Sequence, residues 1–336
     1  MKLIFSEINL VFSIICSIFV EDKNNWTMIN FSKFNSLYSV ATYFNTESKC
    51  RQAIVTSRWG DDVVCPYCGQ HHCNQRKDGR FCCSKCNCNF SEKVGTIFEN
   101  TKIPLRKWFM AMYLISSHKK GISSHQLSRD IDVTQKTAWF ILQKIRTLFT
   151  QDDTIALMGD VECDEAYIGG KEKNKHESKR TKGTQGRSTK TKTPVFGMIQ
   201  RGGKVVALKC DKTDGATLLP IIDQFVAEGS NIYTDELTSY NGLDATKYTH
   251  KVVNHGRNEY VKGADFTNTM EGFWGVYLKR MIEGTYHSIS AKYLQRYIDE
   301  AVWRYNTRGM RGGGRFEIMF KASEGVVDYM AVRDVA

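Results

Sequence analysis

The chain has 336 residues, of which 41% are hydrophobic and 12% aromatic, and it carries a net charge of +11 at pH 7. This length allows about two or three domains. The apolar content excludes an intrinsically disordered chain, and the excess of positive charge favours a polyanionic partner, nucleic acid first and an anionic membrane second.

The chain opens with an apolar run, INLVFSIICSIFV, at residues 8–20. The run is shorter than the roughly 20 residues that a membrane span needs, and no small-residue cleavage site of a signal peptide follows it. We therefore expect translation to begin at Met28 and residues 1–27 to be an extension outside the fold. Residues 28–60 are expected to form a helical segment of a cytoplasmic protein without a membrane partner.

Cysteines are concentrated in the next segment, where seven of the eleven lie between Cys65 and Cys88. Four of them form two CxxC pairs, Cys65 with Cys68 and Cys83 with Cys86. This spacing is typical of a zinc ribbon, in which each pair supplies two thiolates to a tetrahedral Zn²⁺. Cys82 and Cys88 could compete as ligands, and a disulfide cluster is the alternative. We expect a ribbon with structural Zn²⁺ over residues 61–95.

Helical patterns follow in residues 96–150. Apolar residues recur at helical spacing from Leu105 to Ser117, and GISSHQLSRDIDVTQKTAWFILQKIRTLF predicts two further helices joined at DVT. This is the helix-turn-helix pattern, whose second helix enters the major groove of DNA. Gln135 and Lys136 at its start are the expected base contacts. A plain helical linker is the alternative.

The segment VECDEAYIGG, from Val161 to Gly170, predicts a strand with Glu162 and Asp164 on one face. A hairpin turning at Gly202-Gly203, an amphipathic helix and a strand ending at Asp235 come next. This β-β-β-α-β order is the ribonuclease H-like arrangement, in which the first and fourth strands are neighbours. We therefore expect the carboxylates of Asp164 and Asp235 to converge.

The third acid is expected from NTMEGFWGVYLKRMI, which supplies Glu271. Two Mg²⁺ ions held by such acids would activate the attacking oxygen and stabilise the leaving oxygen of a phosphodiester. Each acid also has a simpler explanation. Asp164 could stand on an exposed sheet edge, Asp235 could cap the helix that starts at ELTSY, and Asn268 with Glu271 could form a capping box.

A basic loop separates the first predicted strand from the hairpin. Residues 171–192 hold nine Lys or Arg against two Glu. A solvated loop would explain this charge, but a loop that contacts DNA phosphates would explain it too. The expected phosphate contacts are Lys171, Lys173, Lys175, Lys179 and Arg180.

These features together define the predicted fold class. We expect a multidomain α+β protein with an N-terminal zinc ribbon, a helix-turn-helix, and a ribonuclease H-like α/β catalytic domain with a mixed sheet over residues 155–310. Residues 311–336 are predicted to be a C-terminal tail.

With these motifs the chain resembles the zinc-ribbon insertion-sequence transposases of the DDE type, the ISXO2-like family, which are prokaryotic relatives of the Merlin elements. The resemblance covers about Met28 to Arg311. It rests on the segments RWGDDVVCPYCG, VGTIFENTKIPLRKWF, VTQKTAWFILQKIR, VECDEAYIGGKEKNKHESKR, IYTDELTSYNGL, TNTMEGFWGVYLKR, GTYHSIS and RYIDEAVWRYNTR, in this order.

The resemblance implies that Asp164 and Asp235 are the first two catalytic acids. It implies Glu271 as the third, with Asn268 as the alternative, and Lys279 as a downstream basic residue. Asp164, Asp235 and Glu271 would bind Mg²⁺ or Mn²⁺. The chain departs from the family pattern at Phe266, where a His usually precedes the Thr-Asn pair, which puts the activity of this copy in doubt. His287 in GTYHSIS is the candidate neighbour of the active site.

The implied function is that of a DNA transposase. It would bind the terminal inverted repeats of its own element, cleave the ends and join the 3′-hydroxyls to target DNA by two-metal phosphoryl transfer. The partners would be double-stranded DNA and further copies of the chain, in a homodimer or a larger assembly. The alternative is a DNA-binding regulator with an inactive nuclease-like domain.

Overall fold

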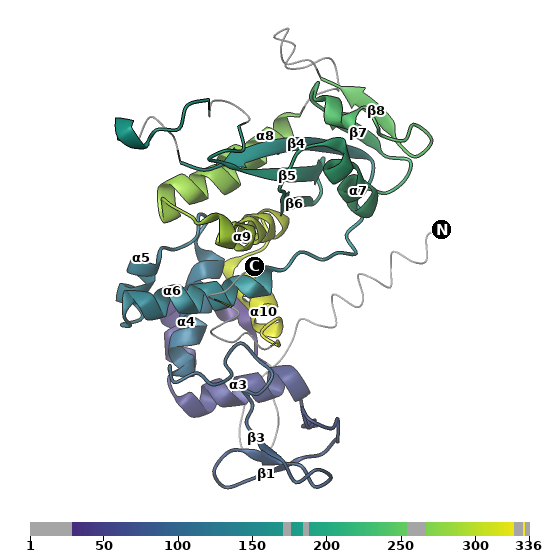
Figure 1. Cartoon of the computed structure of the whole chain (residues 1–336). Coiled ribbons are helices and arrows are strands. Elements are labelled where there is room, and N and C mark those ends of the chain that lie inside the picture. Colours follow the sequence, from purple (N-terminus) through teal and green to yellow (C-terminus); the bar gives the residue numbers. More distant parts are fainter. Residues whose placement is uncertain (1–28, 171–175, 184–187, 254–266, 326–331, 333–336) are drawn as a thin grey trace. The chain divides into compact units, whose positions relative to one another are not determined.

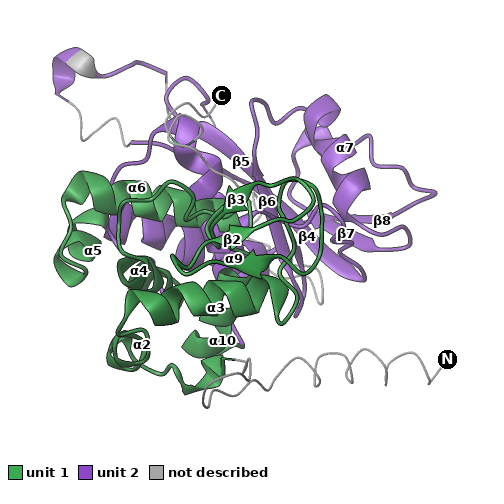
Figure 2. Ribbon diagram, turned by 90° about the horizontal axis from the view of Figure 1, so that it is seen from below, with its two compact units in different colours: residues 1–118, 124–148, 310–334 green, residues 119–123, 149–309, 335–336 purple. Residues whose placement is uncertain are grey.

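The structure is a computed structural model that describes residues 29–170, 176–183, 188–253, 267–325 and 332. The described residues form two compact units (Figure 2). The first unit lies within residues 1–118, 124–148 and 310–334, and the second within residues 119–123, 149–309 and 335–336. The residues predicted to precede the fold, 1–27, lie outside the described part. No helix in the described part is long and apolar enough to span a bilayer.

The first unit contains mostly helices and one small sheet (Figure 1). Its helices are η1 (Phe31–Lys33), α2 (Leu37–Tyr43), α3 (Glu47–Trp59), α4 (Leu105–Ser117), α5 (Ser124–Asp130), α6 (Gln135–Arg146) and α10 (Gly312–Lys321). The strands β1 (Asn74–Gln75), β2 (Phe81–Cys82) and β3 (Asn89–Phe90) form an antiparallel sheet in that order. The predicted helix from Leu105 to Ser117 is therefore confirmed as α4.

The C-terminal residues differ from the prediction. Residues 311–336 are predicted to be a tail, but within their described part Gly312–Lys321 form α10, which packs against α4 in the first unit. Phe316, Met319 and Phe320 recur at helical spacing and are buried, and Phe316 and Phe320 make edge-to-face contacts with Tyr113 and Phe109. Burial of these large apolar side chains explains why the segment folds back.

The second unit is built on a five-stranded mixed sheet in the order β6-β5-β4-β7-β8. Its strands are β4 (Asp160–Ile168), β5 (Thr193–Gln200), β6 (Val205–Lys209), β7 (Asn231–Thr234) and β8 (Thr249–Val252). β4 pairs antiparallel with β5 and parallel with β7, and β8 pairs parallel with β7. The first and fourth strands of the unit are therefore neighbours, and this mixed sheet fits the predicted ribonuclease H-like domain.

Helices cover the two faces of this sheet, because alternate residues of the strands are apolar on both sides. On one face, Val161 and Cys163 of β4 pack with Leu218 and Ile222 of α7 (Gly215–Phe225). On the other face, Ala166 of β4 joins a core that includes α8 (Asn268–Gly272) and α9 (Leu294–Asn306).

The chain after α8 continues as two π-helical segments, η7 (Phe273–Lys279) and η8 (Ile282–Tyr286). Short 3₁₀ turns complete the unit: η2 (Thr147–Phe149), which leads into it, η4 (Glu177–Lys179), η5 (Thr238–Tyr240) and η9 (Ala291–Tyr293). π-Helical turns are uncommon and are frequent at functional sites. Here η7 follows directly on the helix that carries Glu271.

Candidate functional site

Three carboxylates come together in the second unit: those of Asp164, Glu165 and Asp235. One oxygen from each lies within 4.8 Å of the other two. Asp164 and Glu165 stand on the central strand β4, and Asp235 follows directly after β7. Glu162 is opposite Tyr233 in the parallel register of β4 and β7. Asp164 and Asp235 each follow two residues later, so they stand side by side. The structure thus brings the first two predicted acids together.

The structure does not support the simpler explanations for Asp164 and Asp235, which were an exposed sheet edge and a helix cap. Asp164 does not stand at a sheet edge, because β4 is the middle strand and Asp164 is half-buried opposite Gly197. Asp235 does make a local turn contact, since its Oδ1 accepts a hydrogen bond from the Leu237 amide at 2.9 Å. The following 3₁₀ turn η5, however, takes Leu237 as its N-cap and has no side-chain cap. Asp235 is therefore not the cap of that turn.

A glycine opposite Asp164 lets the helical layer approach the sheet closely. A Cβ atom placed on Gly197 would lie 2.2 Å from Met270 Cε and 2.6 Å from Trp274 Cζ2. Because Gly197 has no side chain, Met270 and Trp274 occupy this space, and Trp274 Nε1 donates a hydrogen bond of 3.1 Å to Asp164 Oδ2. The indole therefore holds one oxygen of Asp164 in place.

Negative charge and burial dominate the electrostatics of the site. The pKa of Asp164 is raised to about 6, mainly by burial and also by the negative charges of Asp235 and Glu271, while hydrogen bonds from the Glu165 backbone and Trp274 oppose the rise. Like charges held this close favour protonation or a bound cation. Carboxylate oxygens are the ligands that Mg²⁺ prefers, so this donor set fits a hard divalent ion.

The two candidates for the third position lie on α8, which begins at Asn268. The predicted capping box between Asn268 and Glu271 is not formed, because the N-cap is Thr267, without a side-chain cap, and the Glu271 amide donates to the Thr267 carbonyl. Asn268, Glu271 and Lys279 are all exposed. The negative charge of Glu271 contributes to the raised pKa of Asp164, but Glu271 is not among the three acids that lie within 4.8 Å of one another.

Glu165 is the site residue that the sequence analysis did not select. Strand alternation places its side chain on the face opposite Asp164, and there the buried Tyr240 hydroxyl donates a hydrogen bond to Glu165 Oε1. One of its carboxylate oxygens nevertheless lies within 4.8 Å of oxygens of Asp164 and Asp235. The sequence feature that indicates Glu165 is the adjacent Asp-Glu pair, because the carboxylates of two neighbouring acids on a strand can meet although their side chains start from opposite faces.

The cysteine group lies in the first unit. The sulfurs of Cys65, Cys68, Cys83 and Cys86 all lie within 4.8 Å of one another. Cys65 Sγ is 3.7 Å from Cys86 Sγ, and Cys68 Sγ is 3.5 Å from Cys83 Sγ. Disulfides join sulfurs at about 2.05 Å, and all four of these cysteines are free. The disulfide alternative is therefore wrong for this group.

The geometry of these sulfurs matches a tetrahedral metal. With Zn–S bonds of about 2.3 Å, the sulfurs of a zinc site lie about 3.8 Å apart. Each CxxC turn is closed in the same way: the Gly69 amide donates to the Cys65 carbonyl and the Asn87 amide to the Cys83 carbonyl, both at 3.0 Å. Gly69 and Asn87 both have positive φ, which glycine and asparagine tolerate best. This cysteine cluster could therefore bind zinc.

The spare cysteines lie beside this group, not in it. Cys82 Sγ contacts the Cys83 carbonyl, and Cys73 Sγ contacts the Gln70 carbonyl at 3.5 Å. Cys73 is not among the four sulfurs that lie within 4.8 Å of one another.

Comparison with known proteins identifies the family. A family model described as the ISXO2-like transposase domain matches residues 156–306. A Halobacterium salinarum protein, "Uncharacterized protein in transposable element ISH50", is 31% identical over 241 residues, which cover 68% of this chain and 81% of that protein. The chain belongs to the ISXO2-like transposase family.

Two further similarities are weaker or shorter. A Haemophilus influenzae "Uncharacterized transposase-like protein" is 31% identical over 103 residues, or 31% of this chain and 81% of that protein. A chain in a cryoEM structure of the simian T-cell lymphotropic virus intasome with PP2A regulatory subunit B56 gamma is 12% identical. It has a TM-score of 0.28 over 54% of this chain and 63% of that chain, too low a score for a comparison of the folds.

In this member of the ISXO2-like family, α5 and α6 form the predicted pair of helices. Thr134 caps α6 by accepting a hydrogen bond from the Thr137 amide. Of the two expected base contacts, Lys136 is exposed, whereas Gln135 is half-buried and its Nε2 donates to Ser124 Oγ at 2.8 Å. Gln135 therefore joins the two helices, and its base contact stays a prediction.

The predicted basic loop of this family member is described only in part. Lys171, Lys173 and Lys175 lie outside the described residues, as does Phe266. Lys179 ends the 3₁₀ turn η4, and Arg180 after it is exposed. His287, the candidate neighbour of the acids, is exposed with φ of 58°, and its Nδ1 is 3.0 Å from the Glu283 carbonyl oxygen. Its described contact is thus local.

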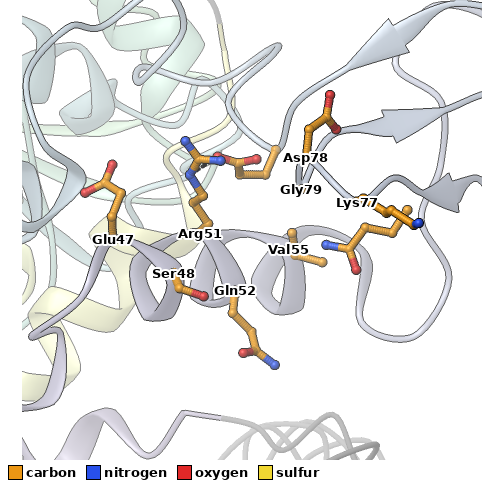
Figure 3. Close-up of a pocket in the computed structure, with 10 residues that line it drawn as sticks. Glu47, Ser48, Arg51, Gln52, Val55, Lys77, Asp78 and Gly79 are labelled. Carbon is orange, nitrogen blue, oxygen red and sulfur yellow. Dashed lines mark ion pairs between the residues drawn. The ribbon is translucent and has the colours of Figure 1, made fainter.

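A cavity of about 660 Å³ lies in the first unit between α3 and the turn that joins β1 to β2 (Figure 3). Its lining includes Arg51 and Lys77 but also Glu47, Asp78 and Glu92. Glu92 is buried, and its Oε1 is 3.7 Å from Arg51 Nε. The mixed charges make this cavity a poor match for the uniformly anionic backbone of DNA.

Proposed function

We propose that this chain is an active DNA transposase that binds the terminal inverted repeats of its own insertion sequence, cleaves the ends and joins the 3′-hydroxyls to target DNA. The observation that carries this proposal is the convergence of the carboxylates of Asp164, Glu165 and Asp235 on the central strands of a mixed sheet, in a chain of the ISXO2-like family.

The acids supply the oxygen ligands for the metal. Asp164, Asp235 and Glu271 would hold Mg²⁺ or Mn²⁺, with Asn268 as the alternative to Glu271. Glu271 is preferred because its charge acts on Asp164. When bound, two such ions activate the attacking oxygen and stabilise the leaving oxygen of the phosphodiester. Glu165 is a fourth oxygen donor at the same place.

Neighbouring side chains keep the acids in position. Trp274 orients Asp164 through its indole N–H, and Tyr240 restrains Glu165 from the opposite face. Lys279 lies two turns beyond Glu271 on the continuous helical segment formed by α8 and η7 and is exposed. It would contact a DNA phosphate beside the acids, as would the basic loop that contains Lys179 and Arg180.

Recognition of the element ends is assigned to the first unit. The cysteine cluster would hold structural Zn²⁺ and form the ribbon around β1, β2 and β3. Helices α5 and α6 would act as the helix-turn-helix, with the exposed Lys136 at the start of α6 facing DNA. The two ends of an element must be joined in one reaction, so the active form would be a homodimer or larger assembly on DNA in the cytoplasm.

The test uses purified protein and DNA that carries both flanks of its own gene. With Mg²⁺ we expect new 3′-hydroxyl ends and joined products, both lost in Asp164→Asn. Cleavage without joining would instead indicate a nuclease, and tight end binding without cleavage in either Mg²⁺ or Mn²⁺ would indicate a DNA-binding regulator. Both of these results would contradict the proposal.

A further inference from the structure

Glu162 is a fully buried carboxylate in the middle of β4, two residues before Asp164. It faces the helical layer formed by α8 and η7, and it is not one of the acids within reach of a shared metal. A buried carboxylate is costly unless its oxygens are paired. Its partners therefore show what the residue does.

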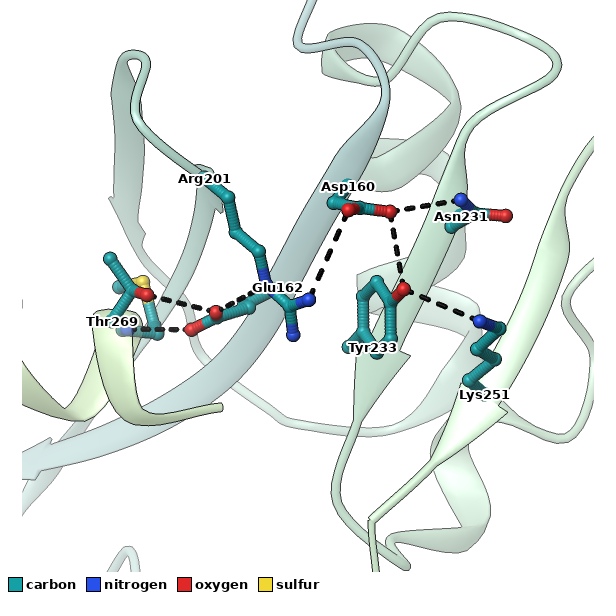
Figure 4. A network of polar contacts seen from close by, with 8 residues as sticks. Asp160, Glu162, Arg201, Asn231, Tyr233, Lys251 and Thr269 are labelled. Carbon is teal, nitrogen blue, oxygen red and sulfur yellow. Dashed lines mark hydrogen bonds and ion pairs between the residues drawn. The ribbon is translucent and has the colours of Figure 1, made fainter. Parts of the chain in front are cut away.

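Three donors reach Glu162 from two other elements (Figure 4). Arg201, which follows β5, donates from Nε to Oε1 at 2.8 Å. The Thr269 hydroxyl donates to the same oxygen at 2.9 Å, and the Met270 amide donates to Oε2, also at 2.9 Å. Two of the three donors thus belong to the first turn of α8, the helix that carries Glu271.

The first turn of α8 has no side-chain cap of its own. Its N-cap, Thr267, makes no such hydrogen bond, and the first amides of a helix have no partner within the helix. Glu162 supplies the missing acceptor for the Met270 amide from the neighbouring strand. The start of α8 is therefore tied to β4 by a side chain of the strand.

Members of the polar network around Glu162 stand two residues before each of the three acids in the sequence. Glu162 precedes Asp164 by two residues, Tyr233 precedes Asp235 by two, and Thr269 precedes Glu271 by two. Arg201 links the first two of these positions, since it bonds to Glu162 and its guanidinium lies 3.9 Å from the centre of the Tyr233 ring. Contacts at these positions therefore fix how β4, β7 and α8 are aligned two residues later, where the acids stand.

Asp160 completes the network from the start of β4. Its Oδ1 accepts hydrogen bonds from Asn231 Nδ2 at 2.9 Å and from the Tyr233 hydroxyl at 3.1 Å. Its Oδ2 lies 4.0 Å from Arg201, and Lys251 Nζ of β8 reaches the Tyr233 hydroxyl at 3.4 Å. The network therefore connects β4, β7, β8, the end of β5 and α8.

We propose that Glu162 is a positioning residue for the transposition chemistry: it clamps the first turn of α8 to β4 and so sets the separation of Asp164, Asp235 and Glu271. This inference rests on the proposed function, because it assumes that these acids bind metal together. Glu162 acts through α8 and does not touch the metal or the DNA.

The test compares three variants with the wild type. In Glu162→Gln, the amide NH₂ replaces one acceptor oxygen, and Arg201 loses the nearer of its two carboxylate partners and keeps Asp160. Thr269→Val is a milder change of nearly the same shape that removes one hydrogen bond. Glu228→Gln is the control, since Glu228 is exposed in the same unit and lies outside the network. All three should retain affinity for end DNA.

The first measurement is amide hydrogen exchange on metal-free protein. We expect exchange at Met270 and its neighbours in α8 to accelerate by about tenfold or more in Glu162→Gln, and less in Thr269→Val. Protection of α7, on the other face of the sheet, should stay unchanged. A purely structural role would instead loosen both faces, because the whole unit would be less stable.

The second measurement is Mn²⁺ affinity by electron paramagnetic resonance, alongside the rate of Mg²⁺-dependent cleavage. Small displacements of aligned groups cost up to about 100-fold in rate, and loss of supporting contacts costs about 10- to 100-fold in metal affinity. We expect losses in this range for Glu162→Gln and none for Glu228→Gln.

The outcomes separate this inference from the function on which it rests. A wild type that cleaves and binds Mn²⁺, together with an equally competent Glu162→Gln, would overturn the inference alone. A wild type that neither cleaves nor binds Mn²⁺ would overturn the proposed function and the inference with it. Exchange that rises equally in α7 and α8 would reject the clamp in favour of general stabilisation.

Discussion

The two units of this protein each gather a group of metal-ligand side chains, but they do so in opposite ways. The cysteine group of the first unit comes from two turns of one short segment, residues 65–86, beside strands of two residues each. The acid group of the second unit takes Asp164 and Glu165 from β4 and Asp235 from the end of β7, and the charge of Glu271 on α8 acts on Asp164.

The supporting cores differ in the same sense. Around the cysteines the core is small, with Phe81 and Phe90 as its main buried aromatic residues. The acids lie on a sheet that has a hydrophobic core on each face. We therefore expect the first site to need its metal in order to fold, and the second to fold without metal and be under electrostatic strain until metal binds. The predictions below test this contrast.

The largest effect is expected from Cys65→Ser. Loss of one thiolate should release the bound zinc, whose binding free energy in small zinc domains is about 10 kcal/mol or more. Metal analysis should then show no stoichiometric zinc, and β1 to β3 should lose protection from hydrogen exchange while β4 to β7 keep theirs. Cys73→Ser is the control and should retain zinc. A Cys65→Ser protein with full zinc content would contradict the ligand set.

Gly197→Ala tests how closely the helical layer must approach Asp164. The added Cβ would lie 2.2 Å from Met270 Cε and 2.6 Å from Trp274 Cζ2, so both side chains must move. Overpacking of this kind costs about 2–3 kcal/mol, measured by denaturant unfolding, and should also displace the indole from Asp164. Gly170→Ala, with open space around the new methyl group, should have little effect. Equal stability of the two variants would mean that the layer can shift freely.

Asp164→Asn should act on stability in the opposite direction to the cysteine variant. It removes one of several like charges that are crowded without a cation and leaves an amide oxygen for the Trp274 N–H. In the absence of divalent metal we expect the variant to be more stable than wild type by about 1–2 kcal/mol. Mg²⁺ should raise the Tm of wild type but not that of the variant. A destabilised metal-free variant would mean that the acids are not strained.

Asp299→Asn separates a buried acid from a metal-binding acid. Burial raises the pKa of Asp299 from 3.8 to about 6, although Gln151 and Gln295 donate hydrogen bonds to it. The folded state therefore binds the proton more tightly, and wild type loses stability as the pH rises from about 4 to about 6.

The amide in Asp299→Asn does not titrate, so the variant should nearly equal wild type near pH 4 and exceed it by up to about 3 kcal/mol at pH 7. Its response to Mg²⁺ should match that of wild type. Asp211→Asn, at an exposed position, should change neither property. A stability difference that is independent of pH would contradict the assignment of the shift to Asp299.

Much of the fold follows from local patterns. The helix from Leu105 to Ser117, the hairpin at Gly202-Gly203 and the strand that precedes Asp235 are all present as predicted, because apolar spacing and turn residues act over a few positions. The cysteine group is equally local, since two CxxC turns bring their own sulfurs together.

The misplaced features all depend on packing between distant segments. The sequence pattern does not predict α10, because the burial of its apolar residues depends on contacts with Phe109 and Tyr113 of α4. The capping box at Asn268 is an equally good local prediction. In the structure, however, the N-cap of α8 is Thr267, one residue earlier, and the Met270 amide donates its hydrogen bond to Glu162 instead. The sequence pattern does not predict Glu165 as a site residue, because strand alternation, taken alone, points its side chain away from Asp164.

The sequence by itself determined the two CxxC turns, the order of the first four strands of the second unit and the family, because these depend on spacing along the chain; it did not predict β8. Only the tertiary structure decided that Glu165 meets Asp164 and Asp235, that Glu162 holds α8, and that Gly197 lets Trp274 reach Asp164. The physical reason is that a buried charge takes its partners from whichever elements pack beside it, and sequence spacing does not specify that choice when the partners are as far apart as Glu162 and Met270.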